Sequence, residues 1–360
     1  MAWTTNHAGA RWGPPAHPLR RLAFMKTSTL LKLAAGVGLV AGARAVLRAK
    51  RRLDLRGKVV VITGGSRGLG LVLARMLVER GAKVAVCARH ADELERARID
   101  LTERGGQVFA SACDVTDRDD IQRFIAEARD ELGPIDALIN NAGVVHIGPM
   151  ELMNVEDYEH EMRTHLWGPL HATIAVLPEM RARGGGRIVN IASIGGKIAI
   201  PHLVPYSASK FALVGMSAAM RAELAQENVF VTTVCPGLMR TGSPRHALIK
   251  GQHRAEYAWF ATADSLPFTS MSAERAADAI IDALVHGDAE VVLSIPAKIV
   301  ATLYGLAPNI VDEAFGLLAR LLPASNHDRR TLEGKDAESA LAPSVLTTLG
   351  DDAARRNHEL

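Results

Sequence analysis

The segment 58–79 constrains the fold of this chain more than any other. It opens with the β-branched run "KVVVIT", passes through the glycine-rich stretch "TGGSRGLG" at 63–70, and becomes helix-periodic in "LGLVLARMLVERG". A strand that leads through glycines into a helix begins a βαβ unit, in which the turn is tight and the helix amino terminus faces a pyrophosphate. We therefore expect a dinucleotide to be bound by Gly64, Ser66, Arg67, Gly68, Leu69 and Gly70.

The alternation of strand and helix continues along the chain. Short apolar runs occur at "AKVAVCAR", "QVFASACDV", "IDALINNAG", "GRIVNIAS" and "AEVVLS", and helix-periodic stretches lie at 91–104 and 272–286. Strands that alternate with helices predict a parallel sheet covered by helices on both faces. We therefore predict an α/β fold with a doubly wound parallel sheet, a Rossmann fold, as the single main domain at 53–294.

The end of the second expected strand indicates which dinucleotide binds. A free ribose 2′-hydroxyl is usually bound there by an acidic residue, but this chain reads "CARH", with Ala88 and Arg89. Arg67 lies inside the glycine turn, and two arginines without a carboxylate suit a 2′-phosphate. We expect NADP(H) rather than NAD(H), and the alternative for Arg89 is an ordinary surface arginine.

A second candidate site lies in "PYSASKFALVGM" at 205–216, where Tyr206 precedes Lys210 by four residues. On a helix the two side chains share one face, where an ammonium would lower the pKa of the phenol and make it an acid/base near neutral pH. An isolated pair of this kind is more often a half-buried tyrosine beside a solvated lysine. Other motifs have to decide between the two interpretations.

Taken together, the motifs resemble the short-chain dehydrogenase/reductase family, in its reductase-type branch, over roughly residues 53–294. In the family's order and spacing the chain has "TGGSRGLG" at 63–70, "CDV" at 113–115, "NNAG" at 140–143, Ser193 thirteen residues before Tyr206, "YSASK" at 206–210 and "PGLMRT" at 236–241. The resemblance implies an NADP(H)-dependent oxidoreductase that acts on CH–OH groups and interconverts a carbonyl compound and its alcohol.

The resemblance also implies a role for each motif residue. Tyr206 would be the general acid/base, Lys210 would hold the nicotinamide ribose and lower the Tyr206 pKa, and Ser193 would hydrogen-bond the substrate oxygen. The remaining motif residues would bind the cofactor: Asp114 and Val115 at the adenine, Asn140, Asn141, Ala142 and Gly143 around its ribose, and Pro236, Gly237 and Thr241 at the nicotinamide carboxamide. The alternatives are a strand-end cap for Ser193 and a helix cap for Thr241.

One position departs from the family pattern. The family usually has an asparagine twenty-two residues beyond the glycine of "NNAG", where it holds a water in a proton relay, and this chain has His165 in "MRTHLWGPL". A histidine can also donate and accept hydrogen bonds, and it titrates near neutrality. Three interpretations remain open: His165 carries an altered relay, the exchange is neutral, or turnover is weakened.

The substrate pocket is expected to be apolar. Its predicted lining comes from 194–205, 146–150 and 242–270, and includes Ile194, Ile198, Leu203, Leu238, Tyr257, Trp259 and Phe260. These residues predict a hydrophobic ketone, aldehyde or alcohol as substrate, and the alternative is that they belong to the core or to a dimer interface. The three cysteines and the histidines show no metal-ligand spacing, so we expect no metal.

The amino-terminal region is strongly basic. Residues 1–58 hold twelve of the 42 basic residues and one of the 39 acidic residues, so the remainder is mildly acidic, which argues against nucleic-acid binding. We predict that 1–24 is disordered or reflects a misassigned start site, and that 25–52 associates with a membrane. Within it, 27–47 could be a spanning anchor, an interfacial helix or a cleaved signal peptide. The basic cluster that follows predicts that the domain lies on the cytoplasmic side of a membrane, or in the cytoplasm.

The carboxy-terminal region is expected to divide in two. The sequence predicts an apolar helical extension at 295–322, which would contact a membrane or a partner subunit, and a disordered tail at 323–360. We expect a homodimer or homotetramer. Two competing functions remain: an NADP(H)-binding sensor or scaffold whose turnover is weakened at His165, and an epimerase or dehydratase of the family's extended branch. The spacing T-G-x-x-x-G-x-G suits the shorter reductase branch better than the extended one.

Overall fold

The computed structural model describes residues 27–360. Helix α1 (Thr27–Arg51) comes first, and the chain from Arg51 to Leu360 forms one compact unit. The predictions for 1–24, and for the first two residues of the 25–52 segment, lie outside the described residues. The compact unit extends well beyond the domain predicted at 53–294.

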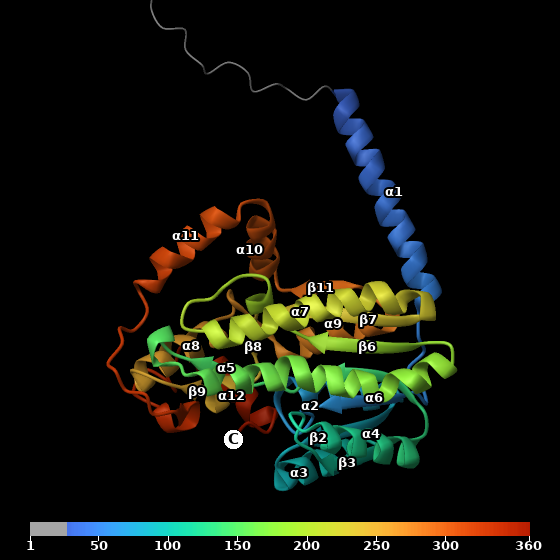
Figure 1. The fold of residues 1–360 in the computed structure, drawn as a ribbon, viewed down its shortest axis with the longest axis horizontal. Helices are drawn as coiled ribbons and strands as arrows, with labels where there is room; N and C mark the ends of the chain where they lie inside the picture. The colour runs from blue at the N-terminus through green and yellow to red at the C-terminus, as the bar shows by residue number, and fades with distance from the viewer. Residues whose placement is uncertain (1–26) are drawn as a thin grey trace, which may run out of the picture. The chain divides into compact units, whose positions relative to one another are not determined.

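A seven-stranded parallel sheet forms the centre of this unit, in the order β3-β2-β1-β4-β6-β7-β11 (Figure 1). The strands are β1 (Val59–Thr63), β2 (Lys83–Ala88), β3 (Val108–Ala112), β4 (Ile135–Asn140), β6 (Gly186–Ile191), β7 (Val229–Pro236) and β11 (Glu290–Leu293). The order reverses between β1 and β4, and ligands of such sheets bind outside the carboxyl ends of the strands at that point. The predicted α/β fold is confirmed, although the sequence reading had not identified β7.

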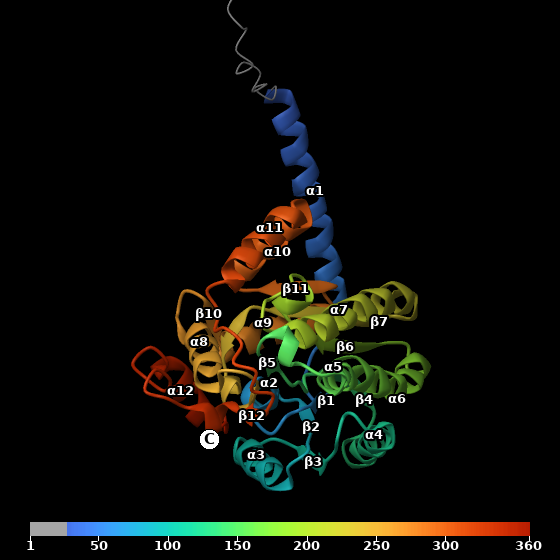
Figure 2. The ribbon, with the colours of Figure 1, turned by 60° about the vertical axis from the view of Figure 1, so that its left-hand side comes forward.

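Helices cover both faces of the sheet, as Figure 2 shows for α3 and α4 on either side of β3. One face carries α2 (Gly68–Glu79), α3 (Ala91–Glu103) and α9 (Ala273–His286), and the other carries α4 (Arg118–Leu132), α6 (Gly168–Ala182) and α7 (Val204–Leu224). Alternate residues of each strand point to opposite faces, so Val60 and Ile62 pack under α2 while Val59 and Val61 pack under α4. Burial of both faces explains why β1 is apolar at nearly every position.

Smaller elements surround the carboxyl ends of the strands. A three-stranded sheet joins β5 (His146–Ile147), β9 (Leu248–Ile249) and β12 (Leu332–Glu333), and a two-stranded sheet joins β8 (Leu238–Arg240) and β10 (Ser270–Ser272). The helices at this end are α5 (Val155–Met162), the π-helical turn η2 (Arg163–Trp167), α8 (His253–Ser265) and α12 (Thr348–Arg356). Four short 3-10 turns also lie here: η1 (Met150–Leu152), η3 (Ile194–Gly196), η5 (Ser243–His246) and η6 (Gly334–Ala337), whereas η4 (Ala225–Glu227) precedes β7 at the opposite end of the sheet. These elements place polar side chains over the glycine turn.

The predicted disordered tail at 323–360 is wrong. Its strand β12 pairs antiparallel with β9, its 3-10 turn η6 buries Ala337, and its helix α12 buries Ala353 and Ala354. Small apolar side chains at intervals through a polar segment are enough to pack it onto a preformed surface, because the body supplies most of the buried area. The low apolar content of 323–360 therefore misled the prediction.

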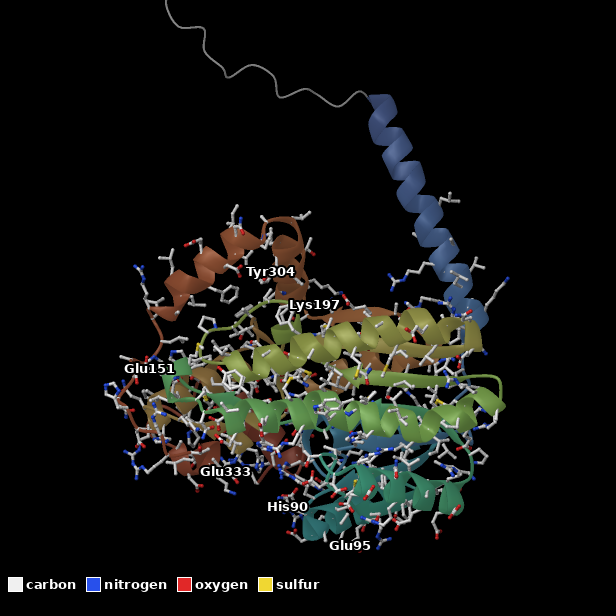
Figure 3. All side chains as sticks on the ribbon, viewed as in Figure 1. His90, Glu95, Glu151, Lys197, Tyr304 and Glu333 are labelled. Atoms are coloured by element: carbon white, nitrogen blue, oxygen red, sulfur yellow. The ribbon has the colours of Figure 1, made fainter. Side chains whose placement is uncertain are left out.

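The apolar extension predicted at 295–322 is helical. It forms the helices α10 (Ile295–Leu306) and α11 (Pro308–Ala319), which contact each other (Figures 1 and 2). In Figure 3, Tyr304 of α10 lies on the opposite side of the molecule from His90 and Glu333. Their exposed apolar residues are Ile295, Ile299, Leu303, Leu306, Ile310, Leu317 and Leu318. Over residues 27–360, we find no helix with the length and apolar character required to cross a membrane.

Candidate active site

A cavity of about 340 Å³ lies at the carboxyl ends of β1, β4 and β6. It brings together most of the residues predicted to act in binding or catalysis: Gly64, Ser66, Arg67, Gly68, Leu69, Arg89, Asp114, Val115, Asn141, Ala142, Gly143, His165, Ser193, Tyr206, Lys210, Gly237 and Thr241. Gly70, Asn140 and Pro236 do not line it. Asn140 instead donates to Asn190 on β6 (2.8 Å), and Pro236 ends the buried strand β7.

The glycine turn is tight because its glycines lack side chains. Gly64 has a φ of +66°, and a Cβ on Gly70 would overlap the Gly64 carbonyl oxygen. The Asn141 side-chain amide fixes the turn by donating to the carbonyl oxygens of Thr63 (3.1 Å) and Gly64 (2.9 Å). Gly68, with a φ of +56°, begins helix α2, whose first N–H groups have no partner within the helix. This turn fits the phosphates of a dinucleotide.

Two carboxylates surround the arginine of this turn. Arg67 Nη1 donates to both oxygens of Glu93 (2.7 and 2.8 Å), Ser66 Oγ donates to the same carboxylate (3.2 Å), and Arg67 Nε lies 3.3 Å from Glu359 Oε2. Arg89 is exposed at the end of β2 and lines the same cavity. The sequence motifs include the two arginines but neither acid, because Glu93 lies in the first turn of α3 and Glu359 follows α12.

The predicted catalytic residues meet on the other side of the cavity. Tyr206 and Lys210 occupy the first turns of α7, and Ser193, which follows β6, lies close enough to Tyr206 to affect its ionisation. Ser193 Oγ also accepts from Gly195 N (3.0 Å), so its predicted alternative role as a cap exists alongside the contact with Tyr206. Lys210 Nζ donates to the Ile191 carbonyl oxygen (3.0 Å) and lies 5.6 Å from the centre of the Tyr206 ring.

The expected lowering of the Tyr206 pKa is not observed. Burial raises the pKa of Tyr206 to about 12, although the hydrogen bond with Ser193 opposes the rise. Burial also lowers the pKa of Lys210 to about 8, opposed by the charge of Glu161. Because the ammonium lies over the ring face and points to a carbonyl, desolvation dominates the free energy of ionising the phenol.

His165 lies in the π-helical turn η2 and is fully buried. Its Nε2 accepts from Val144 N (3.2 Å), so the proton of the neutral ring is on Nδ1, which lies 3.0 Å from Glu161 Oε2 and 2.8 Å from Ser209 Oγ. Its ring meets the Tyr206 ring edge to face, with centroids 5.5 Å apart. Burial and the charge of Lys210 lower the pKa of His165 to about 4, so the ring is neutral at neutral pH.

Glu161 is a functional candidate that the sequence reading missed. Burial alone would raise its pKa, but hydrogen bonds from His146 and His165 outweigh that effect and lower the pKa to about 2. Glu161 Oε1 accepts from His146 N (2.8 Å) and lies 3.0 Å from His146 Nδ1. A buried carboxylate therefore lies beside His165, the residue that replaces the family's usual asparagine. The i, i+4 spacing of Glu161 and His165 is the sequence feature that could have indicated this contact.

The rest of the lining is mixed. Of the expected apolar residues, Ile194, Leu203, Leu238 and Phe260 face the cavity together with Ile200, whereas Ile198, Tyr257 and Trp259 do not line it. Asp114 lines the cavity and accepts from Thr116 N (2.9 Å). Asp264 of α8 also lines the cavity, and burial raises its pKa to about 7 although Met239 N donates to it (3.0 Å).

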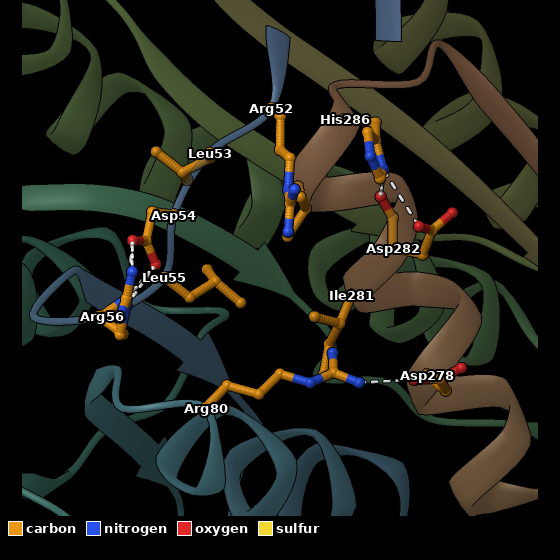
Figure 4. A pocket seen from close by; sticks show the side chains of 11 residues that line it. Arg52, Leu53, Asp54, Leu55, Arg56, Arg80, Asp278, Ile281, Asp282 and His286 are labelled. Atoms are coloured by element: carbon orange, nitrogen blue, oxygen red, sulfur yellow. Dashed lines mark hydrogen bonds and ion pairs between the residues drawn. The ribbon is translucent and has the colours of Figure 1, made fainter. Parts of the chain in front are cut away.

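A second cavity of about 850 Å³ contains none of the predicted site residues (Figure 4). It lies between the 52–56 segment, Arg80 and α9, and its lining includes the ion pairs Arg56–Asp54 (2.7 Å) and Arg80–Asp278 (2.5 Å). Among the described residues, no cluster of histidine, cysteine, aspartate or glutamate could hold a metal ion. The smaller cavity is therefore the candidate active site.

Comparison with known proteins agrees with this geometry. The sequence model of the short chain dehydrogenase family matches residues 58–248. A "Dehydrogenase/reductase SDR family protein 7-like" of Anopheles gambiae is 35% identical over 262 residues, covering 71% of this chain and 81% of that protein. A "Putative ketoacyl reductase" of Streptomyces coelicolor is 39% identical over 186 residues, covering 51% of this chain and 71% of that protein. The crystal structure of a single-substitution variant of actinorhodin polyketide ketoreductase with NADPH superposes with a TM-score of 0.59 and 32% identity, covering 66% of this chain and 95% of that one.

Proposed function

The chain belongs to the short-chain dehydrogenase family of NAD(P)(H)-dependent oxidoreductases, and from this we propose that it reduces a hydrophobic ketone or aldehyde to the alcohol with NADPH, or carries out the reverse reaction. The observation that carries the proposal is the meeting of Ser193, Tyr206 and Lys210 in the cavity that also contains the glycine turn. The dinucleotide supplies a hydride, which adds to the carbonyl carbon.

Tyr206 would supply the proton in this reaction. As the carbonyl carbon gains the hydride, its oxygen becomes negative and needs hydrogen-bond donors, and the hydroxyls of Ser193 and Tyr206 both reach into the cavity. A pKa of about 12 keeps Tyr206 protonated, as a general acid requires. Lys210 would stabilise the phenolate that forms once the proton has left, and this is the sense in which it lowers the cost of ionising Tyr206.

The proposed preference for NADP(H) rests on Arg67 in the glycine turn and Arg89 at the end of β2. Both line the cavity on the side where the ribose of an adenosine would lie, and a guanidinium is suited to bidentate contact with a phosphate. Glu93 opposes this preference, because its carboxylate already holds Arg67. We expect Arg67 to exchange that partner for the 2′-phosphate.

The proposed substrate class rests on the apolar part of the lining, chiefly Ile194, Ile200, Leu203, Leu238 and Phe260. An apolar pocket with a few placed hydroxyls suits an apolar carbonyl compound. The similarity to ketoacyl and polyketide ketoreductases favours a ketone within an acyl chain.

The test is NADPH oxidation with a panel of apolar ketones and aldehydes, for the wild type and Tyr206→Phe. The variant should lose at least about a hundredfold in kcat while binding NADPH with unchanged affinity, because only the proton donor is removed. Tyr158→Phe is the matched control, since Tyr158 is a partly buried tyrosine of α5 that does not line the cavity. Full activity of Tyr206→Phe would refute the assignment, and NADPH binding without turnover of any carbonyl would favour the sensor instead.

We also propose that helix α1 and the basic residues at its end hold the protein at the cytoplasmic face of an anionic membrane, and that the protein is a homodimer or homotetramer. The support for the membrane is the run Arg48, Lys50, Arg51 and Arg52, which suits anionic headgroups. Sedimentation with phosphatidylserine vesicles at low and high salt tests this association. A chain that stays in the supernatant at low salt would refute the membrane proposal.

Light scattering of the purified full chain measures the number of subunits and so tests the proposed homodimer or homotetramer.

A further inference from the structure

The segment 354–359 lies directly on the glycine turn. The Asn357 carbonyl oxygen accepts from Gly68 N (2.9 Å), and the Asn357 side-chain amide donates to the Thr241 carbonyl oxygen (3.5 Å). A Cβ on Gly242 would come within 2.6 Å of Ala354 Cα, so the two backbones are in close contact. Asn357 itself is almost fully buried. The segment is thus fixed to two motifs that were predicted to bind the cofactor, the glycine turn and the loop that carries Thr241.

Glu359 brings a carboxylate into this contact. Its side chain is 4% exposed, and Oε2 lies 3.3 Å from Arg67 Nε and 3.0 Å from His246 Nε2. A Cβ on Gly68 would overlap Glu359 Oε1, so the carboxylate fills the space that the missing side chain of Gly68 leaves. In a dinucleotide-binding turn, that space is where the backbone approaches the pyrophosphate.

The carboxylate and the phosphates of a dinucleotide therefore need the same groups. Gly68 N is one of the N–H groups at the start of α2 that have no partner within the helix, and an N–H in that position favours an anionic or carbonyl acceptor. Here that acceptor is Asn357, and the nearby cation is Arg67. Two anions in this small space would repel each other, and Gly68 N can serve only one acceptor well.

From these contacts we infer that Glu359 and the backbone of Asn357 compete with the dinucleotide for the glycine turn, so that the 354–359 segment sets cofactor affinity. Binding then requires the segment to leave the turn, and the observed affinity is the intrinsic affinity multiplied by the fraction of molecules in which it has left. The inference rests on the proposed function, because it takes the cavity to be the dinucleotide site.

The experiment measures NADPH binding by titration calorimetry for the wild type, Glu359→Gln and a variant that stops after Arg356. Both variants should bind NADPH about 5- to 30-fold more tightly, the range of a modest coupling free energy. Asp352→Asn is the matched control, because it removes one negative charge from α12, where Asp352 pairs with Arg355 outside the cavity. Its affinity should equal that of the wild type.

Three results would overturn the inference. Unchanged affinity in both variants would show that the segment does not compete, and weaker binding would show that it clasps the bound cofactor. Hydrogen exchange of the wild type provides an independent readout, since saturating NADPH should speed exchange of amides 353–359, and slower exchange would refute displacement. If the wild type and all variants bind neither NADPH nor NADH, the proposed function fails as well, which distinguishes that outcome from the first two.

Discussion

Replacing His165 by asparagine should flatten the acid side of the protein's pH–stability curve. Burial holds the pKa of His165 at about 4, whereas an unfolded histidine titrates at about 6.5. Because the folded pKa is the lower one, the unfolded state binds the proton first, and the native state loses stability as the pH falls from about 6.5 to about 4. Linkage gives a loss of about 2 kcal/mol between pH 7 and pH 5 from this one side chain.

Glu161, the partner of His165, titrates at a lower pH, so the two side chains affect stability over different pH ranges. Glu161 has a pKa of about 2 in the folded state and an ordinary value of 4.5, so its stabilisation is complete above 4.5 and is lost only as the pH falls towards 2. His165→Asn should therefore be less stable than the wild type at pH 7, because the buried Glu161 carboxylate loses a polar ring nitrogen 3.0 Å from Oε2, at a cost of about 1–3 kcal/mol. At pH 5 most of that difference should have disappeared.

Urea unfolding of both proteins at pH 7, 6 and 5, followed by circular dichroism, measures the effect. The free energy of unfolding of the variant should fall by about 2 kcal/mol less than that of the wild type over this range. His90→Asn is the control, because it replaces an exposed histidine at the start of α3. Parallel curves for the wild type and His165→Asn would refute the buried, neutral state of His165.

Three further changes test other parts of the site. Gly70→Ala places a Cβ against the Gly64 carbonyl oxygen, so it should lower the free energy of unfolding by about 1–3 kcal/mol and abolish NADPH binding, measured by urea unfolding and calorimetry. Glu93→Gln releases Arg67 from an ion pair, and the ratio of NADH to NADPH dissociation constants should rise by about 3- to 10-fold. Glu161→Gln removes a charge that keeps the Lys210 pKa from falling further, so the alkaline limb of the kcat profile should move to lower pH. An unmoved limb would show that Glu161 does not act on the reaction through Lys210.

The sheet could be predicted from sequence because its information is local. In β1, "VVVIT" is apolar at nearly every position since both faces are covered, and the glycines that follow it allow only a turn. Strand β7 has the same apolar character in "VFVTTVCP", but it is missing from the strands expected from the sequence. The prediction of disorder for 323–360 failed for a different reason. The order of this segment depends on contacts with residues far away in sequence, such as the pairing of β12 with β9.

The motif residues of the site were also predictable, since their spacing is fixed by the strands that carry them. The side chains that set their charge state were not. Glu161 reaches His165 through the π-helical turn, and Glu93 reaches Arg67 from another helix. Neither acid belongs to a motif, so counting charges within motifs overstated the positive charge at the glycine turn.

The same error explains why two arginines were given so much weight in the choice of cofactor. Arg67 has ion pairs with both Glu93 and Glu359, so its charge is already compensated in the absence of a phosphate. The free energy gained from a 2′-phosphate is therefore the difference between that contact and the two carboxylate contacts it replaces. A cofactor preference at this turn is decided by how readily the two acids release Arg67, and Glu359, which lies 292 positions further along the chain, is the one that sequence spacing could not connect to it.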